Sequence, residues 1–315
     1  MAAVALVASS ATAGPTHVAE DGQVAEYDDL RRDRAAPRGG ALVRADPETF
    51  LPGDRGTVLL IHGFDSSPAM WRGQAAYLYA QGYRLLPIRW EPSRPGMTIP
   101  EVAEEVLRPA IAEALEDETL RAPLHAIGHS TGGLLLRWLV EQSPEDPLEL
   151  DKLVLLSTPN AGARTGVASI ACDTYKQPWR EIACELKPSS ATLQTLGTKV
   201  PDGVATEYLT FGVETRPNLL PAPGFDGDGD GTRHTHDNAV MAESAWLEGA
   251  EFRIWRGVRT RSHFTVACSS TVAVWIRGFL AGLPVPPQVE GRVPTDDLCR
   301  DAKFEKLRAF APPIP

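Results

Sequence analysis

The chain has 315 residues, 43% of them hydrophobic and 23% charged, and its formal net charge at pH 7 is -10. These proportions are ordinary for a globular protein, and the length suits one large domain or two modest ones. No apolar run reaches the roughly 18 residues that a transmembrane helix needs, and the acidic charge argues against a nucleic-acid partner.

The N-terminal part of the chain predicts an exported protein with an arm before its main domain. Residues 1–13 are small and apolar, and residues 11–13 (Ala-Thr-Ala) fit the small-x-small rule of a secretory cleavage site. We interpret this stretch as a signal-peptide remnant. Residues 14–50 are charged and turn-rich and are expected to form an N-terminal arm. The expected location is secreted or periplasmic.

The cysteines agree with an oxidising compartment. The chain has four of them, Cys172, Cys184, Cys268 and Cys299, and four cysteines allow three pairings. Closeness in the sequence favours Cys172–Cys184 and Cys268–Cys299. The alternative is buried free thiols in a cytosolic protein.

From about residue 57 short apolar runs alternate with segments of helical periodicity. We expect strands at residues 57–61, 83–90, 124–128, 152–157, 208–213 and 252–258. We expect helices at residues 68–81, 99–117, 132–142, 239–247 and 266–280. This alternation predicts the α/β class, with a mostly parallel central sheet and helices on both faces. The rhythm breaks at about residues 160–203, which we interpret as a small inserted cap within a domain spanning residues 51–283. A Pro-rich C-terminal tail follows at residues 284–315.

A candidate nucleophile lies between the strand at 124–128 and the helix at 132–142. Gly128-His129-Ser130-Thr131-Gly132 matches the G-x-S-x-G elbow, in which a serine occupies a tight, strained strand-to-helix turn. Glycines are required there because neighbouring side chains would clash. The amides at the start of the following helix favour developing negative charge near the serine. The alternative, a glycine-rich turn with an inert serine, does not account for this context.

With these motifs the chain resembles the bacterial secreted lipases and esterases of the α/β-hydrolase superfamily. His62-Gly63-Phe64 is similar to the family's H-G-x turn, and the resemblance implies oxyanion-hole amides from Phe64 and Thr131. Two backbone donors aimed at one point stabilise a tetrahedral oxyanion, each by about 3 kcal/mol of barrier. Residues 157–162 are similar to the family's T-P-H-x-G segment, with Asn160 where histidine is usual.

The base and the acid of a triad must follow the serine in the order acid, then histidine. Of the seven histidines, His263 follows the last expected strand, where the resemblance places the catalytic base. Residues 236–245 resemble the family's N-D-G-x-V-P-x-x-S-A segment, which makes Asp237 the expected acid. Asp230 is the rival, because residues 229–232 partly match a G-D-G-T-V form of the same segment.

The segment before Asp237 also suggests a metal. Asp226, Asp228 and Asp230 follow the D-x-D-x-D-G spacing, and hard oxygen ligands at alternate positions can wrap around one Ca²⁺. The flanking residues depart from an EF-hand, so the alternatives are another calcium geometry or an acidic, Gly-rich loop. A zinc site from His234, His236 and an aspartate is a weaker alternative.

The expected activity is carboxylic-ester hydrolysis through Ser130, Asp237 and His263, with an acyl-enzyme. The alternatives are an acyltransferase with the same triad and a non-catalytic binding protein on this fold. No cofactor is required, although Ca²⁺ remains an expectation. The expected partner is a lipid or another ester, with at most transient contact with a lipid surface, no nucleic acid, and a monomeric state. Triad chemistry does not distinguish triglycerides, short-chain esters, phospholipids and polyesters.

Overall fold

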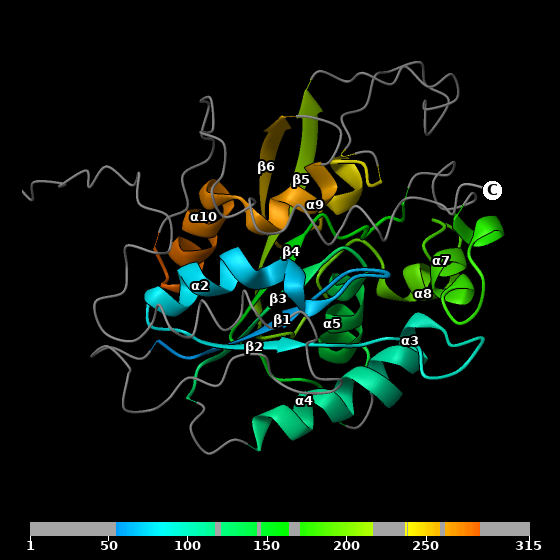
Figure 1. Cartoon of the computed structure of the whole chain (residues 1–315), viewed down its shortest axis with the longest axis horizontal. Coiled ribbons are helices and arrows are strands. Elements are labelled where there is room, and N and C mark those ends of the chain that lie inside the picture. Colours follow the sequence, from blue (N-terminus) through cyan, green and yellow to red (C-terminus); the bar gives the residue numbers. More distant parts are fainter. Residues whose placement is uncertain are drawn as a thin grey trace, which may run out of the picture.

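Six strands form an open parallel sheet in the computed structural model, which describes residues 55–116, 121–143, 146–163, 171–216, 237, 239–258 and 262–283. The strands are β1 (Thr57–Ile61), β2 (Arg84–Ile88), β3 (Leu124–His129), β4 (Lys152–Leu156), β5 (Glu207–Arg216) and β6 (Glu251–Val258). Their order across the sheet is β2-β1-β3-β4-β5-β6, and each neighbouring pair is parallel (Figure 1). The expected α/β class is therefore confirmed.

Helices cover both faces of this sheet. They are η3 (Pro68–Trp71), α2 (Arg72–Ala80), α3 (Ile99–Val102), η4 (Ala103–Leu107), α4 (Arg108–Leu115), α5 (Thr131–Glu141), α7 (Arg180–Glu185), α8 (Ala191–Leu196), η5 (Glu243–Ala245), α9 (Ser262–Thr265), η6 (Val266–Cys268) and α10 (Ser270–Leu280). Helices α2 and α10 lie on one side of the sheet, and α3, α4 and α5 lie on the other (Figure 1). None of the described helices is long and apolar enough to cross a bilayer.

The strand side chains divide between two apolar cores. Val58 and Leu60 of β1 face the core under α2 and α10, whereas Leu59 and Ile61 face the core under α3 to α5. Alternate residues of a strand point to opposite faces, and both faces of this sheet are covered. This explains why β1 is a continuous apolar run, TVLLI, rather than an alternating one.

The helix predicted at residues 239–247 is wrong. This stretch contains only the short turn η5, since the Asp237 side chain accepts hydrogen bonds from the amides of Ala239 and Val240. A side chain that binds the next amides favours a tight turn over a continuing helix. The other expected strands and helices are present, with ends shifted by a few residues.

Between β4 and β5 the chain forms α7 and α8, where the sequence predicts a cap at residues 160–203. A disulfide joins Cys172 to Cys184 in this stretch, as expected. The bounds of the cap remain a prediction. The signal-peptide remnant, the N-terminal arm and the C-terminal tail lie outside the described residues, as does Cys299 of the second expected disulfide.

The strand order places a site at one edge of the sheet. The chain runs from β1 outward to β2 and then returns to β3 on the other side of β1. Ligands of open α/β sheets bind outside the carboxyl ends of the strands, at such a switch point. Ser130 directly follows β3, and His62 directly follows β1.

Candidate active site

Ser130 occupies a strained position between β3 and α5. Its backbone has φ 52° and ψ -126°, a conformation that non-glycine residues rarely adopt and that costs on the order of 1–3 kcal/mol. The turn is held because the Ser130 amide donates to Leu156 O at 2.9 Å and its carbonyl accepts from Gly133 N at 2.9 Å. The side chain is therefore presented at the end of the strand rather than along it, as the elbow motif predicts.

Glycines around the elbow allow backbones to approach closely. A methyl group on Gly132 would lie 2.3 Å from His62 O, and one on Gly133 would lie 2.0 Å from Thr158 Oγ1. A methyl group on Gly63 would lie 3.0 Å from Ser130 Cβ. Because these glycines have no side chain, the turn after β1 and the start of α5 can pack closely around Ser130.

His263 and Asp237 form a buried pair. The Nδ1 atom of His263, on α9, lies 2.6 Å from Oδ2 of Asp237, and both side chains are almost fully buried. The same Oδ2 accepts a hydrogen bond from Ser157 Oγ at 2.5 Å, and Oδ1 accepts from Ala239 N at 2.9 Å and from Val240 N at 2.7 Å. Asp237 is thus bound on both carboxylate oxygens.

These contacts decide the ionisation of Asp237. Burial by itself raises the pKa of a carboxyl group, but the charge of His263 and the hydrogen bonds from His263, Ser157 and Val240 outweigh it. The pKa of Asp237 is therefore lowered, and the carboxylate is the ionised partner that a histidine base needs.

His129 links the histidine to the elbow. Its Nε2–H donates to the His263 carbonyl at 2.7 Å, and the two rings pack with centroids 4.8 Å apart. Because His129 directly precedes Ser130, this contact brings His263 next to the serine. The Ser130 hydroxyl has no hydrogen-bond partner within the described part of the chain.

The two predicted oxyanion amides are available. Within the described ranges, neither the Phe64 nor the Thr131 N–H donates to another protein group. Thr131 is the first residue of α5, so its amide belongs to the positive end of the helix dipole.

A hydrogen bond on the preceding carbonyl orients the Phe64 amide. His62 Nδ1–H donates to Gly63 O at 2.9 Å, and the N–H of the same planar peptide points the opposite way. His62 Nε2 accepts from Trp90 N at 3.2 Å, and Trp90 Nε1–H donates to His62 O at 2.8 Å. Burial lowers the pKa of His62 to about 4, so its ring is neutral and can accept at Nε2.

Three residues that hold the site residues in place were not identified from the sequence. Ser157 follows β4 without a glycine motif, His129 occupies a variable elbow position, and Trp90 follows an edge strand. The signals for Ser157 are its place at the carboxyl end of a buried parallel strand beside β3 and the resemblance of residues 157–162 to a family segment.

The other predicted site residues lie elsewhere. Asp226, Asp228 and Asp230 are outside the described residues, as are His234 and His236, so the calcium and zinc hypotheses remain predictions. Within the described ranges, no cluster of three or more His, Cys, Asp or Glu side chains could hold a metal.

Comparisons with known proteins identify the fold. No protein-family model and no curated protein matches the sequence. Among solved structures, the mature lipase BlEst2 from Bacillus licheniformis is 17% identical, with a TM-score of 0.55 over 78% of this chain and 99% of that chain. Phospholipase PlaB from Legionella pneumophila in complex with thio-NAD is 16% identical, with a TM-score of 0.51 over 75% of this chain and 59% of that chain. The chain therefore spans about three fifths of the phospholipase and nearly all of the mature lipase. The two neighbours are named a lipase and a phospholipase, and the chain shares their fold.

Proposed function

We propose that the protein is a serine carboxylic-ester hydrolase that acts through Ser130, His263 and Asp237. The observation that carries the proposal is the strained Ser130 next to His129, which packs on a His263 ring whose Nδ1 lies 2.6 Å from a buried carboxylate. An inert serine would gain nothing from a backbone conformation that destabilises the fold. The structural neighbours named a lipase and a phospholipase support an ester or lipid substrate.

In the proposed reaction Ser130 Oγ attacks the ester carbonyl carbon while His263 Nε2 takes its proton. Asp237 holds the imidazole through Nδ1–H and stabilises the imidazolium. The carbonyl oxygen becomes an oxyanion that accepts hydrogen bonds from the Phe64 and Thr131 amides. His263 then protonates the leaving alcohol, and an acyl-enzyme forms on Ser130.

The second half of the reaction releases the acid. His263 takes a proton from water, and the resulting hydroxide attacks the acyl carbon. The tetrahedral intermediate uses the same two amides, and its collapse returns the proton from His263 to Ser130 Oγ. Each intermediate is thus met by donors that are already in place, and this preorganisation is the main source of rate in such sites.

A covalent phosphonate probe tests the proposal. We expect a fluorophosphonate to label the wild type with one equivalent and to abolish hydrolysis of p-nitrophenyl butyrate. Ser130→Ala should lose labelling and lower kcat by roughly a millionfold, as loss of a triad serine does elsewhere. Ser189→Ala, at an exposed serine, is the matched control and should retain both. Full activity in Ser130→Ala would refute the proposal.

We further propose that the protein works in an oxidising compartment, secreted or periplasmic. The Cys172–Cys184 disulfide supports this, because such bonds persist where glutathione does not reduce them. Calcium binding by Asp226, Asp228 and Asp230 is proposed only on the sequence spacing.

A further inference from the structure

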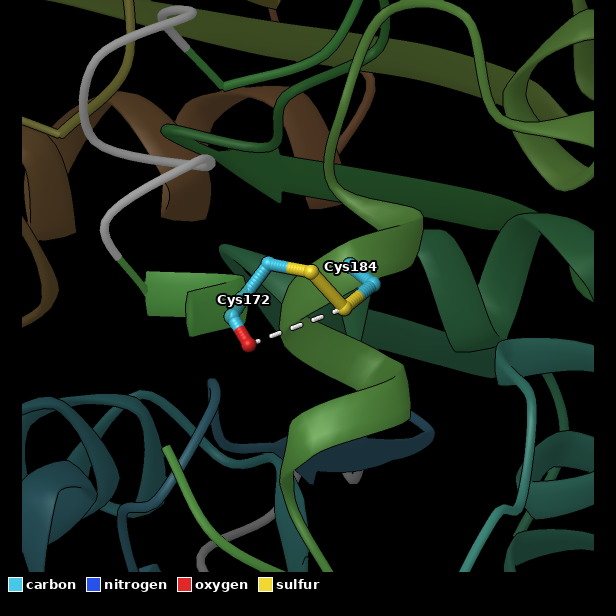
Figure 2. The surroundings of a disulfide bond; sticks show 2 residues. All are labelled: Cys172 and Cys184. Carbon is cyan, nitrogen blue, oxygen red and sulfur yellow. Dashed lines mark hydrogen bonds between the residues drawn. A yellow bond between two sulfur atoms is a disulfide. The ribbon is translucent and has the colours of Figure 1, made fainter. Parts of the chain in front are cut away.

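The disulfide between Cys172 and Cys184 closes a loop that lies against the oxyanion turn. The two cysteines are 12 positions apart, and Cys184 belongs to α7 (Figure 2). The loop is also tied to the body of the protein, because Gly96 N donates to Gln177 Oε1 at 3.0 Å. At its far end Glu185 accepts a hydrogen bond from Ile99 N at the start of α3.

Two aromatic side chains of this loop pack on Phe64. The Tyr175 and Phe64 rings meet edge to face, with centroids 4.7 Å apart, and Trp179 meets Phe64 in the same way at 5.1 Å. Trp179 also contacts Trp90, whose centroid is 5.4 Å away. Edge-to-face packing is the favourable geometry for aromatic pairs. Tyr175 and Trp179 thus anchor the loop on Phe64, the residue whose amide is a proposed oxyanion donor.

The three rings of this cluster keep part of their surface accessible. Phe64, Tyr175 and Trp179 are each partly exposed, whereas Trp90 beneath them is buried. The Phe64 ring belongs to the same residue as this amide, so a substituent of an ester whose carbonyl oxygen accepts from the amide can reach the ring. Partly exposed aromatic surface next to a reacting group is the usual lining of an apolar subsite.

An acidic side chain next to the Phe64, Tyr175 and Trp179 rings limits which ester substituents can bind there. Asp65 follows Phe64, and burial raises its pKa. Burial and the charge of Asp65 both raise the pKa of Tyr175. The effect of Asp65 on Tyr175 indicates a carboxylate near the cluster, and an ionised carboxylate repels an anionic substituent. The cluster therefore suits a neutral, apolar group.

We propose that Phe64, Tyr175 and Trp179 form the wall that binds the apolar substituent of a neutral ester, and that the Cys172–Cys184 disulfide holds this wall in place. The inference rests on the proposed ester hydrolysis and names the part of the substrate that the site selects. It makes Tyr175 and Trp179 specificity-determining residues. Their ring contacts are with Phe64 and Trp90, so we expect the bond-breaking steps themselves not to depend on them.

Two ester series test the wall. The first varies the acyl chain of p-nitrophenyl esters from acetate to butyrate, octanoate and dodecanoate. The second keeps an acetyl group and varies the alcohol over the same lengths. We expect kcat/KM of the wild type to rise with chain length in one series, which identifies whether the acyl or the alcohol part lies on the wall.

In that series Trp179→Ala and Tyr175→Ala should each lower kcat/KM for the long esters by roughly tenfold, while acetate changes less than about twofold. Trp179→Leu keeps apolar volume and should give a smaller loss. Trp246→Ala, at a tryptophan that is 44% exposed and outside the cluster, is the matched control and should leave both series unchanged. Cys172→Ser/Cys184→Ser should lose chain-length preference like Trp179→Ala, with acetate hydrolysis retained.

The outcomes separate this inference from the proposed function. Equal losses on acetate and on long esters in Trp179→Ala, Trp179→Leu and Tyr175→Ala would overturn it, because the rings would then only support the fold. Unchanged chain-length preference in these variants would overturn it as well. If the wild type hydrolysed no ester in either series and took no phosphonate label, the proposed function would fail first. A wild type that hydrolyses a carboxylate-ended ester as well as its neutral analogue would contradict the assignment to neutral substituents.

Discussion

Replacing Ser157 tests whether its hydroxyl, which binds Asp237 and does not contact substrate in the proposed reaction, affects kcat. Ser157 is 1% exposed and donates to the same Asp237 oxygen that binds His263. A hydrogen bond to a charged group contributes about 1.5–3 kcal/mol, which corresponds to a factor of about 10 to 150. Asp237 keeps three other hydrogen bonds in Ser157→Ala. We therefore expect kcat to fall by about tenfold, the lower end of this range. KM should not change, because the Ser157 hydroxyl binds Asp237 and not the substrate.

The backbone of Ser157 supplies a matched comparison. Its φ is 48°, a value that costs alanine roughly 1 kcal/mol but glycine very little. Ser157→Ala and Ser157→Gly both remove the hydroxyl, so both should lose the same factor in kcat. Ser157→Gly should unfold at a higher urea concentration than Ser157→Ala.

The assay for Ser157 must count active sites. Phosphonate titration gives the folded, competent fraction, and kcat is then expressed per titrated site. A boronic acid, which mimics the tetrahedral intermediate, should bind both variants more weakly in parallel with kcat. The reasoning would be refuted if kcat per site stayed within twofold of the wild type, or if Ser157→Gly recovered the rate that Ser157→Ala lost.

Three further predictions concern the buried contacts around the site. Trp90→Phe removes the donor to His62 O and should lower kcat severalfold without raising KM, measured by steady-state kinetics on a short ester. The pKa of His62 is lowered from 6.5 to about 4, so its contribution to stability is complete above pH 6.5 and is lost as pH falls from 6.5 to 4. Urea unfolding should show about 3 kcal/mol of this loss in the wild type and much less in His62→Gln. Arg137 and Glu141 form an ion pair with both side chains 0% exposed, so Arg137→Met should destabilise the fold by about 3–5 kcal/mol and Arg137→Met/Glu141→Leu by less, as measured by urea unfolding.

The sheet could be predicted because its strands are buried on both faces. The VLLI part of β1 and the LVLL part of β4 are apolar runs too short for a helix, and each is followed by turn residues. Amphipathic helices between them require parallel pairing. The helix predicted at residues 239–247 failed because the periodicity of its apolar residues does not reveal that the Asp237 side chain binds the next amides.

The site was predictable only where local motifs encode it. Ser130 lies between glycines that its turn requires, and His263 lies between the last strand and the last long helix. Asp237 and His263 were each expected from their own segments, and their contact joins residues 26 positions apart. Ser157 was not expected, and its contact with Asp237 joins residues 80 positions apart. Pairings of that range depend on the packing of whole elements. The same holds for the rings of Tyr175 and Trp179 on Phe64, more than a hundred positions away.

Ser130 and Ser157 occupy the same kind of strained turn at the ends of neighbouring strands. Strands β3 and β4 pair with His129 opposite Leu156, so the two serines that follow these residues are neighbours at the carboxyl edge of the sheet. Both have positive φ, and the amide of each donates to the adjacent strand, Ser130 N to Leu156 O and Ser157 N to Phe211 O. The ladder hydrogen bond therefore continues through each turn and offsets part of the backbone strain, while the side chain leaves the plane of its strand.

The segment after each serine decides the role of that serine. Ser130 is followed at once by α5, whose first amide can meet an oxyanion, and its hydroxyl is free among the described residues. Ser157 is followed by an irregular segment, and its hydroxyl is committed to Asp237. A strained strand end thus presents the proposed nucleophile Ser130 where a helix begins. The strand end without a following helix presents Ser157, a fixed hydrogen-bond donor. The strain at Ser157 would be unexplained if that residue served only packing, because alanine or glycine would fill the same turn without a buried hydroxyl to satisfy.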